Sequence, residues 1–226
     1  MRPADDHGKS TISCAMCAGA DPARQTPLQR ILPPGQSRFI AQSERFAAVP
    51  TFGCFTPGYV LIIPRAHVLS FGRLGRQALA EAQQVADTVA ARISEVYQMP
   101  VLGFEYGNNM PGGRRIAHAH WHLLPTEADL GGWLTRRMDG QLIRSFTELP
   151  CGGDSSYIAV RTQQGQLMTF SVPNRPRQAV RLRRLVAELD PRIDATAWDW
   201  ASSNHDDLIR QTAADLAGHL PAGTMS

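Results

Sequence analysis

Lysine is almost absent from this chain: Lys9 is the only one, and arginine supplies the rest of its 23 basic residues. The formal net charge is only +3, and no basic run carries interleaved aromatic residues, so the sequence predicts no nucleic-acid partner. Long hydrophobic runs are also missing, because the longest one, YVLIIP, is far too short to cross a bilayer. We therefore expect neither a nucleic acid nor a membrane among the partners of this protein.

Cysteine is scarce as well, with four in 226 residues, and the opening stretch MRPADDHGKSTISC lacks the apolar core of a secretory signal. These features predict a cytoplasmic protein whose cysteines stay reduced. Cys54 and Cys151 have no evident partners, and we expect each to be a small buried residue. The hydrophobic and charged fractions, 43% and 19%, are those of an ordinary globular protein.

We expect an α+β fold, an antiparallel sheet with a long helix, and hydrophobic periodicity indicates where its strands and helices lie. Residues 1–35 are polar and rich in Pro and Gly, so we expect an irregular N-terminal arm there. Residues 36–126 should form the main domain. Its expected elements are a hairpin over 37–51 that turns at 43–45, a central strand over 58–63, a helix over 74–97, and strands over 101–106 and 116–125.

Residues 127–226 form a C-terminal extension, for which we expect a lobe of strands and two helices. The segments LIRSFTEL, YIAVRT and LMTFSV have the character of strands. The two helices are expected near 177–189 and 206–220, the second with Ser203 or Asn204 as its N-cap. Val180, Leu185 and Leu189 fall at helical spacing and predict the buried face of the first helix.

The segment AHAHWHLLP places His118, His120 and His122 at alternate positions in an apolar run. Side chains alternate across a strand, so the three imidazoles should share one side. Two chemical interpretations remain open at this point. The histidines could hold one catalytic metal ion, or one imidazole could attack phosphorus while its neighbours handle protons and phosphate oxygens. Three alternate positions on a strand span about 13 Å between the outer Cα atoms, which is awkward for one ion.

A glycine-rich segment, GNNMPGGRR, comes directly before the histidines and favours the phosphorus chemistry. Such a loop lets backbone N–H groups approach an anion closely, and two arginines add charge at its end. The candidate phosphate-binding residues are Asn108, Asn109, Gly113, Arg114 and Arg115.

HAHWHLL, in this context, resembles the signature of the histidine triad (HIT) superfamily of nucleotide hydrolases and transferases. GYVLIIPRAHV resembles the family's strand and turn ending in Pro-x-x-His, and FEYGNNMPGGRRIAH resembles the loop before the triad. The resemblance covers about residues 12–126, so 36–126 would be a HIT domain. It implies that His120 is the nucleophile that takes the nucleoside α-phosphate, that His122 contacts phosphate oxygens and assists the leaving group, and that His118 supports them.

Cys14 and Cys17 form a lone C-x-x-C, which could be a redox pair, half of a zinc site or neither. Zinc-bearing members of the superfamily complete a site with the histidine of Pro-x-x-His and the first histidine of the triad. The resemblance therefore implies a structural zinc held by Cys14, Cys17, His67 and His118, which would also hold the N-terminal arm. No organic cofactor is expected.

The resemblance implies a nucleotide substrate containing adenine: a nucleoside phosphoramidate, a nucleotidyl sulfate or a dinucleoside polyphosphate. Hydrolysis is favoured because transferase branches often replace the third histidine by Gln, whereas His122 is retained. A nucleotidyltransferase or phosphorylase with an anionic acceptor is the alternative, and a metalloenzyme is a third class. Many family members have Gln-Ser or Gln-Thr where this chain has Arg114 and Arg115, which indicates a more anionic leaving group or acceptor. A homodimer is expected because dimers are common in the superfamily.

Arginines crowd one segment of the C-terminal extension, at positions 175, 177, 181, 183 and 184. Such a run is usually a solvated helix face. The alternatives are that it extends the pocket toward a longer polyphosphate or contacts a second subunit.

Overall fold

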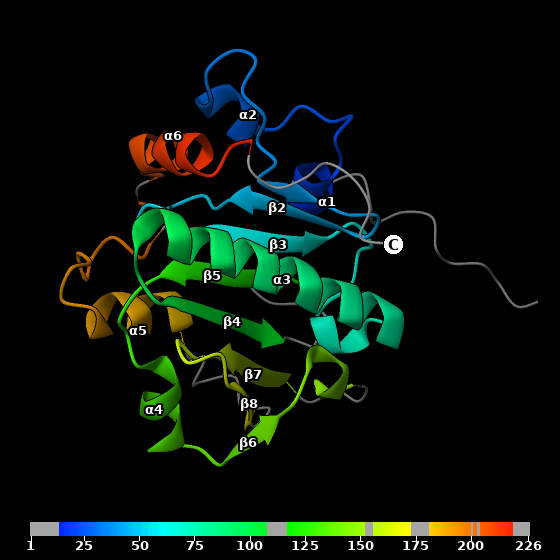
Figure 1. Ribbon diagram of the computed structural model, residues 1–226, viewed down its shortest axis with the longest axis vertical. Helices are drawn as coiled ribbons and strands as arrows, with labels where there is room; N and C mark the ends of the chain where they lie inside the picture. Colours follow the sequence, from blue (N-terminus) through cyan, green and yellow to red (C-terminus); the bar gives the residue numbers. More distant parts are fainter. Residues whose placement is uncertain are drawn as a thin grey trace, which may run out of the picture.

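The structure is a computed structural model that describes residues 14–107, 117–151, 156–172, 181–199, 201–202 and 204–218. It contains one eight-stranded sheet in which every pair of neighbouring strands is antiparallel (Figure 1). The spatial order is β1-β2-β3-β5-β4-β7-β8-β6. The strands are β1 (Ala41–Gln42), β2 (Phe46–Pro50), β3 (Val60–Pro64), β4 (Val101–Gly107), β5 (Trp121–Pro125), β6 (Gly140–Ile143), β7 (Ser156–Arg161) and β8 (Leu167–Val172).

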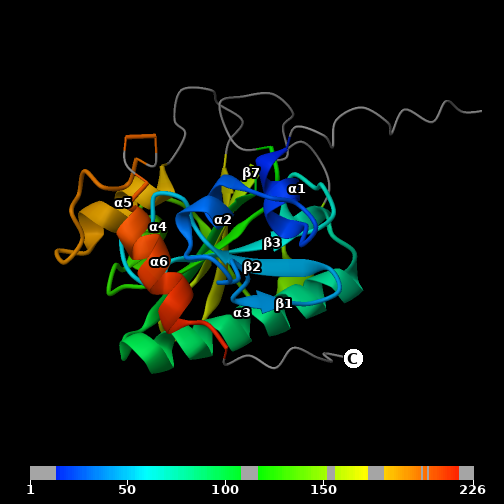
Figure 2. The same ribbon diagram turned by 90° about the horizontal axis from the view of Figure 1, so that it is seen from above.

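Helices cover both faces of this sheet. The long helix α3 (Arg76–Tyr97) lies alone along one face, and shorter helices lie on the other, as the view from above makes clear (Figure 2). The shorter helices are α1 (Ala15–Ala20), α2 (Pro27–Ile31), α4 (Leu130–Thr135), α5 (Leu182–Leu189) and α6 (Asp206–Asp215), and two 3₁₀ turns are η1 (Phe71–Arg73) and η2 (Phe146–Glu148). Helices therefore cover the central strands from both sides, which explains why consecutive residues of β3, β4 and β5 are buried.

Alternate residues of β2 divide between two hydrophobic clusters. Phe46 and Ala48 pack toward α3, whereas Ala47 and Val49 pack toward the shorter helices. The period of two follows from the pleat of the strand. The second cluster is the one that faces the candidate site, because it contains Tyr59 and residues of α5 and α6.

The predicted α+β fold with an antiparallel sheet and a long helix is confirmed. The hairpin appears as β1 and β2, the central strand as β3, and the helix as α3, which begins two residues later than predicted. In the extension, β7 and β8 match two of the three predicted strands, and β7 pairs with β4. The extension therefore continues the sheet of the preceding residues and shares its core.

Two predicted strands are wrong in part. The strand over 116–125 begins only at Trp121, because Ala119 donates its N–H to the carbonyl of Val68 and the segment before β5 leaves the ladder. LIRSFTEL is a strand only to Ile143 and then forms η2, where the N–H of Phe146 donates to the side chain of Gln83 at 3.0 Å. Burial of Phe146 beneath α3 replaces the expected ladder there.

The N-terminal arm is not irregular throughout, because it contains α1 and α2. Thr26 caps α2 and Pro27 takes its first position, which are ordinary start signals that the short length of the helix obscured. Helix α4 was also missed, although Asp129 caps it by accepting from the N–H of Gly132.

Details of the last two helices differ from the prediction. The residues of α5 that are fully buried are Leu182, Val186 and Ala187, whereas Leu185 and Leu189 are only partly buried; Val180 lies outside the described residues. Helix α6 begins after His205 in a left-handed conformation rather than after Asn204, and Ser203 is not described.

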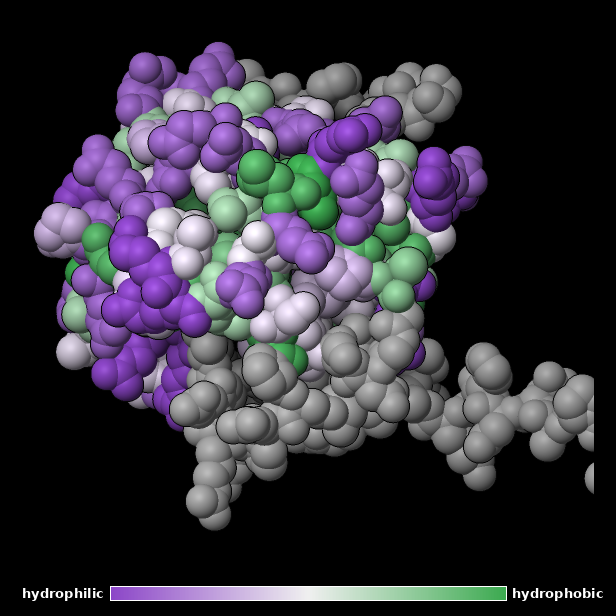
Figure 3. Space-filling model, turned by 90° about the horizontal axis from the view of Figure 1, so that it is seen from below, coloured by the Kyte–Doolittle hydropathy of each residue, from purple (hydrophilic) through white to green (hydrophobic). Residues whose placement is uncertain are grey.

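Hydrophilic residues dominate the face seen from below, with hydrophobic residues in small areas between them (Figure 3). Among the described large hydrophobic side chains, Leu142 of β6 stands out as 68% exposed. Within the part of the chain that is described, no helix combines the length and the apolar character that a membrane span requires.

Candidate active site and metal centre

The three histidines lie on β5 and in the extended residues just before it. His122 belongs to β5, which runs between β3 and β4, so that Leu61 and Phe104 are its neighbours in the ladder. His118 and His120 precede the strand. Because β5 is central in the sheet, the backbone of His122 is held on both sides.

His120 is oriented by the backbone of its own segment. Its Nδ1 atom lies 2.9 Å from the carbonyl oxygen of His118, and its side chain is partly exposed. A carbonyl only accepts, so Nδ1 carries the hydrogen and Nε2 keeps its lone pair. Burial lowers the pKa of His120, the bond to the carbonyl opposes this, and the charge of Arg183 lowers the pKa further. A neutral imidazole with a free Nε2 lone pair is a competent nucleophile.

His122 has a different environment, buried between two aromatic residues. Its Nδ1 atom lies 2.8 Å from the hydroxyl of Tyr59, and its ring stacks on Phe104 with centroids 4.5 Å apart and an interplanar angle of 18°. The rings of His120 and His122 lie 4.8 Å apart. Burial holds the pKa of His122 well below its ordinary value, and repulsion from a protonated His120 and from Arg183 would lower it further, so this imidazole is also neutral near pH 7.

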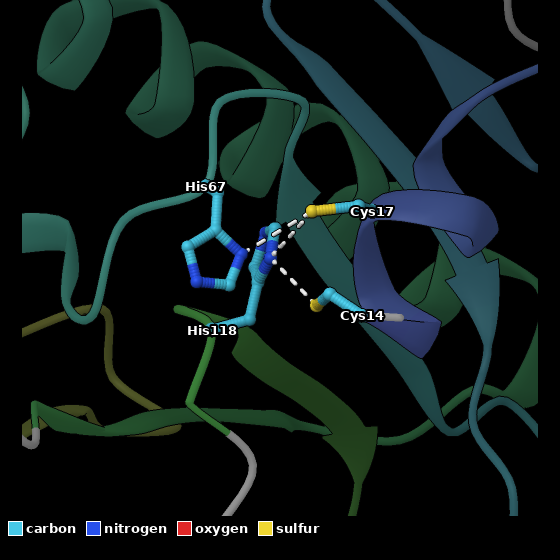
Figure 4. A group of neighbouring side chains, drawn as sticks. All are labelled: Cys14, Cys17, His67 and His118. Carbon is cyan, nitrogen blue, oxygen red and sulfur yellow. Dashed lines mark hydrogen bonds between the residues drawn. The ribbon is translucent and has the colours of Figure 1, made fainter. Parts of the chain in front are cut away.

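The side chain of His118 lies in a cluster with Cys14, Cys17 and His67 (Figure 4). The Nδ1 atom of His118 lies 3.4 Å from the sulfur of each cysteine, and Nδ1 of His67 lies 3.3 Å from the sulfur of Cys17. One ligand atom from each residue falls within 4.8 Å of all the others. Two thiols and two imidazoles that converge in this way are the donor set of a closed tetrahedral zinc site.

The hydrogen bonds around the cluster favour metal binding. Nε2 of His118 donates to the carbonyl of Pro64 at 2.9 Å, which leaves Nδ1 free to coordinate. Burial lowers the pKa of His118 to about 4, so its ring is neutral. Burial, together with the adjacent Cys14, raises the pKa of the Cys17 thiol to about 11, and a divalent cation would reverse that preference because it stabilises thiolates.

The four residues fit a structural zinc, and they come from three separate parts of the chain. Cys14 and Cys17 lie at the start of α1, His67 follows β3, and His118 precedes β5. Among the described residues this is the group whose ligand atoms converge. His120 and His122 are not in this group, and both ring nitrogens of His118 already have other partners, the cysteine sulfurs and the carbonyl of Pro64.

The predicted loop residues Asn108, Asn109, Gly113, Arg114 and Arg115 lie outside the described residues. Of the other cysteines, Cys54 is buried as predicted, and burial raises its pKa to about 11. Cys151 is exposed, so the prediction that it is buried is wrong: it follows η2, where the chain reaches the surface.

Three residues near the triad were not singled out from the sequence: Tyr59, Phe104 and Arg183. Tyr59 and Phe104 sit in the apolar segments that form β3 and β4, where their spacing indicates only burial. Arg183 belongs to the arginine cluster of the extension, and nothing in the sequence distinguishes it from its neighbours.

One segment of this chain matches the model of a known protein family. Residues 35–129 match the model of the HIT domain. A comparison with curated protein sequences found no match.

Solved structures with a similar arrangement include a hypothetical histidine triad nucleotide-binding protein from Sulfolobus tokodaii, with 26% identity, 51% of this chain and 71% of that chain covered, and a TM-score of 0.37. A Zn-bound histidine triad family protein from Mycobacterium smegmatis has 20% identity, coverage of 54% and 81%, and a TM-score of 0.38. A HIT family hydrolase from Clostridium thermocellum has 20% identity, coverage of 54% and 96%, and a TM-score of 0.33.

Proposed function

Residues 35–129 of this chain belong to the HIT domain family, and from that premise we propose that the protein hydrolyses a nucleotide at its α-phosphorus through a covalent nucleotidyl-His120 intermediate. The observation that supports this most directly is the bond from Nδ1 of His120 to the carbonyl of His118, which leaves the lone pair on Nε2. The proposed substrates are a nucleoside phosphoramidate, a nucleotidyl sulfate or a dinucleoside polyphosphate, with adenine as the base.

The proposed reaction has two displacements at phosphorus. In the first, Nε2 of His120 forms a bond to the α-phosphorus, and the leaving group departs with the electron pair of its bond to phosphorus. In the second, water attacks the same phosphorus and the P–N bond breaks, which restores neutral His120. One proton of the water ends on the leaving group and the product is a nucleoside monophosphate. Two displacements through a phosphoramidate replace one difficult attack by water.

The other two histidines have supporting roles in this proposal. His122 lies 4.8 Å from His120, centroid to centroid, and would contact the phosphoryl oxygens and assist departure of the leaving group. His118 would hold the carbonyl that orients His120 and, as a zinc ligand, would keep its own backbone in place.

The zinc in this proposal is structural. Cys14, Cys17, His67 and His118 would complete its coordination and leave no position open for substrate. When bound it would supply folding free energy and a fixed orientation for His118. The loop residues Asn108, Asn109, Gly113, Arg114 and Arg115 remain the proposed phosphate contacts, with the two arginines as the reason to expect an anionic leaving group. A homodimer and a cytoplasmic location also remain predictions.

Transfer of the nucleotidyl group to an anionic acceptor is the alternative reaction. Both reactions share the first displacement, and they differ only in whether water or the acceptor attacks the intermediate. Retention of His122 favours water. A catalytic metal held by all three histidines is disfavoured, because both ring nitrogens of His118 already face other partners.

The test is intact-protein mass spectrometry after rapid quenching without acid, on the wild type and on His120→Gln. The substrates would be adenosine phosphoramidate, adenylyl sulfate, ADP and a diadenosine polyphosphate. An adenylyl adduct in the wild type that is absent from His120→Gln supports the proposal, and the substrate that gives it identifies the leaving group. Turnover without an adduct, or loss of bound zinc in His120→Gln, would count against it. Turnover in ¹⁸O-water, with and without added phosphate, separates hydrolysis from transfer.

A further inference from the structure

Arg183 is the described arginine of the C-terminal cluster whose side chain points into the molecule. Its Nε donates to the carbonyl of Trp198 at 3.1 Å, and its terminal nitrogens donate to the carbonyls of Phe52, at 3.4 Å, and Gly53. By contrast, the guanidinium of Arg184 is 55% exposed and pairs with Glu188. Arg183 thus connects α5 to the segment between β2 and β3, and it comes from outside the matched HIT domain.

The same guanidinium lies against two aromatic rings of the candidate site. Its central carbon is 5.1 Å from the ring centroid of Phe55 and 5.1 Å from that of Tyr59, which is the geometry of a cation–π contact. The hydroxyl of Tyr59 in turn lies 2.8 Å from Nδ1 of His122. One continuous chain of contacts therefore runs from the C-terminal extension to the third histidine of the triad.

The direction of the bond between Tyr59 and His122 follows from counting donors and acceptors. Within the described residues, the phenol has no other hydrogen-bond acceptor besides Nδ1. If Nδ1 carried the hydrogen, the buried O–H of Tyr59 would be left without an acceptor, which is unfavourable because the group has lost its hydrogen bonds to water. Arg183 adds to this preference, because a guanidinium only donates and its positive charge favours a phenol whose oxygen lone pairs face it.

The protonation states are consistent with that direction. Burial raises the pKa of Tyr59 to about 12, although the charge of Arg183 opposes the rise, so Tyr59 keeps its hydrogen near pH 7. His122 is neutral and therefore has a single N–H hydrogen. With Nδ1 accepting from Tyr59, that hydrogen must lie on Nε2.

We infer that Arg183 is a positioning residue which, through Tyr59, holds His122 in the tautomer that carries its hydrogen on Nε2. His122 then presents a donor to the phosphoryl oxygens, while His120 presents a lone pair to the phosphorus. The two neighbouring imidazoles thus hold opposite tautomers, each fixed by its own Nδ1 partner. The role toward the phosphoryl group rests on the proposed function, whereas the tautomer itself does not.

The first measurement is long-range ¹⁵N–¹H correlation NMR on the full-length, zinc-loaded protein. In the wild type, we expect His122 to show a protonated Nε2 and a bare Nδ1. Tyr59→Phe, which keeps the aromatic ring beside Arg183 and the bonds of Arg183 to backbone carbonyls, should mix the two tautomers of His122, and Arg183→Met should do so to a smaller extent. A wild-type spectrum with the hydrogen on Nδ1 of His122 would overturn the inference. This readout needs no substrate, so it stands even if the proposed reaction is wrong.

The second measurement is the kinetics of the substrate that turns over. Arg183→Met and Tyr59→Phe should each lower kcat by about 10-fold, with KM within about 2-fold, because the lost donor acts on the developing charge. The double variant should lose little more than either single one, since both act on the same histidine. Arg184→Met is the matched control and should behave as the wild type. If Arg183→Met fails to fold, Arg183→Lys replaces it, with part of the wild-type kcat. Unchanged kcat and tautomer in both Tyr59→Phe and the Arg183 variant would refute the inference.

Discussion

The sulfur of Cys14 lies 3.4 Å from Nδ1 of His118, although 104 positions separate the two residues in the sequence. This proximity joins the start of α1 to the segment that enters β5, and the same imidazole binds the carbonyl of Pro64 through its other nitrogen. A zinc ion at this point would join the N-terminal arm to the backbone that orients His120. Stability and catalytic geometry are therefore expected to depend on the same cluster.

Cys17→Ala should release the zinc and destabilise the protein. The remaining three ligands cannot close the tetrahedral site, so we expect less than one zinc per chain and a lower urea midpoint than in the wild type. Cys151→Ser is the matched control, because that thiol is exposed and should affect neither quantity. Elemental analysis together with urea unfolding makes the comparison. A full complement of zinc in Cys17→Ala would contradict the proposed ligand set.

Phe104→Leu should lower kcat although it reduces the stability of the protein only slightly. Leucine keeps an apolar side chain at this buried position but removes the flat ring on which His122 stacks. We expect a destabilisation of about 1 kcal/mol and a fall in kcat of about 10-fold. Phe170→Leu, at a buried position in the same cluster, should cost similar stability and leave kcat unchanged. Equal kcat values for the two variants would show that the stacking has no catalytic role.

Glu105→Gln should remove one component of the pH dependence of stability. The carboxyl is buried against Tyr157 and the N–H of Phe71, and burial raises its pKa from the ordinary 4.5 to about 7 despite those hydrogen bonds. The folded protein then holds a proton that the unfolded chain releases, so the free energy of unfolding falls by about 3 kcal/mol between pH 4.5 and 7. Glutamine stays neutral at every pH and should lack this fall.

The measurement for Glu105 is urea unfolding of the wild type and the variant at several pH values from 4.5 to 8. Glu95→Gln, at an exposed position on α3, serves as the control and should keep the wild-type slope. A constant difference between Glu105→Gln and the wild type across this range would mean that Glu105 does not titrate there.

Asp190→Asn should loosen the attachment of α5 to the residues that follow β5. Asp190 accepts from Thr126 Oγ1 at 2.6 Å, from the N–H of Glu127 and from Arg192. Burial opposes its ionisation, but the bonds from Arg192 and Thr126 outweigh it and hold the pKa of this carboxyl well below its ordinary value. We expect a loss of about 3 kcal/mol at pH 7.

The difference in the free energy of unfolding between the wild type and Asp190→Asn should shrink as the pH falls below about 4. Below that pH the wild type loses the stability that depends on an ionised Asp190. Chemical unfolding at pH 7 and pH 3 tests this, with Asp139→Asn as an exposed control whose urea midpoint should stay unchanged. An equal loss of stability at both pH values would mean that the effect does not come from the charge of Asp190.

Local patterns in the sequence predicted the helices and strands that follow from the spacing of their own hydrophobic residues. Helix α3 and strands β3 and β4 follow from periodicity, and the metal cluster follows from a motif that the family resemblance supplied. Arg183 could not be predicted in this way. Whether an arginine on α5 faces solvent or Tyr59 depends on the β2–β3 segment, which is distant in the sequence and near only after folding.

Segments that pair with distant residues also resisted prediction. Strand β5 begins only after His118, whose side chain contacts Cys14 and the carbonyl of Pro64. The 3₁₀ turn η2 replaces a predicted strand because Phe146 is buried under α3. In both places a tertiary contact overrides the alternating pattern that local propensity favours.

The order of the strands also bears on aggregation. The sheet ends at β1 on one side and at β6 on the other, and these have only two and four residues. Unpaired backbone N–H and C=O groups at a sheet boundary can template pairing with another chain, and short boundary strands offer few of them. The longer strand β4 has β5 on one side and β7 on the other, so its backbone is satisfied within one molecule. Removal of the C-terminal extension would uncover the backbone of β4 over Gly103–Gly107, where it pairs with β7, and the truncated protein should aggregate more than the full chain does.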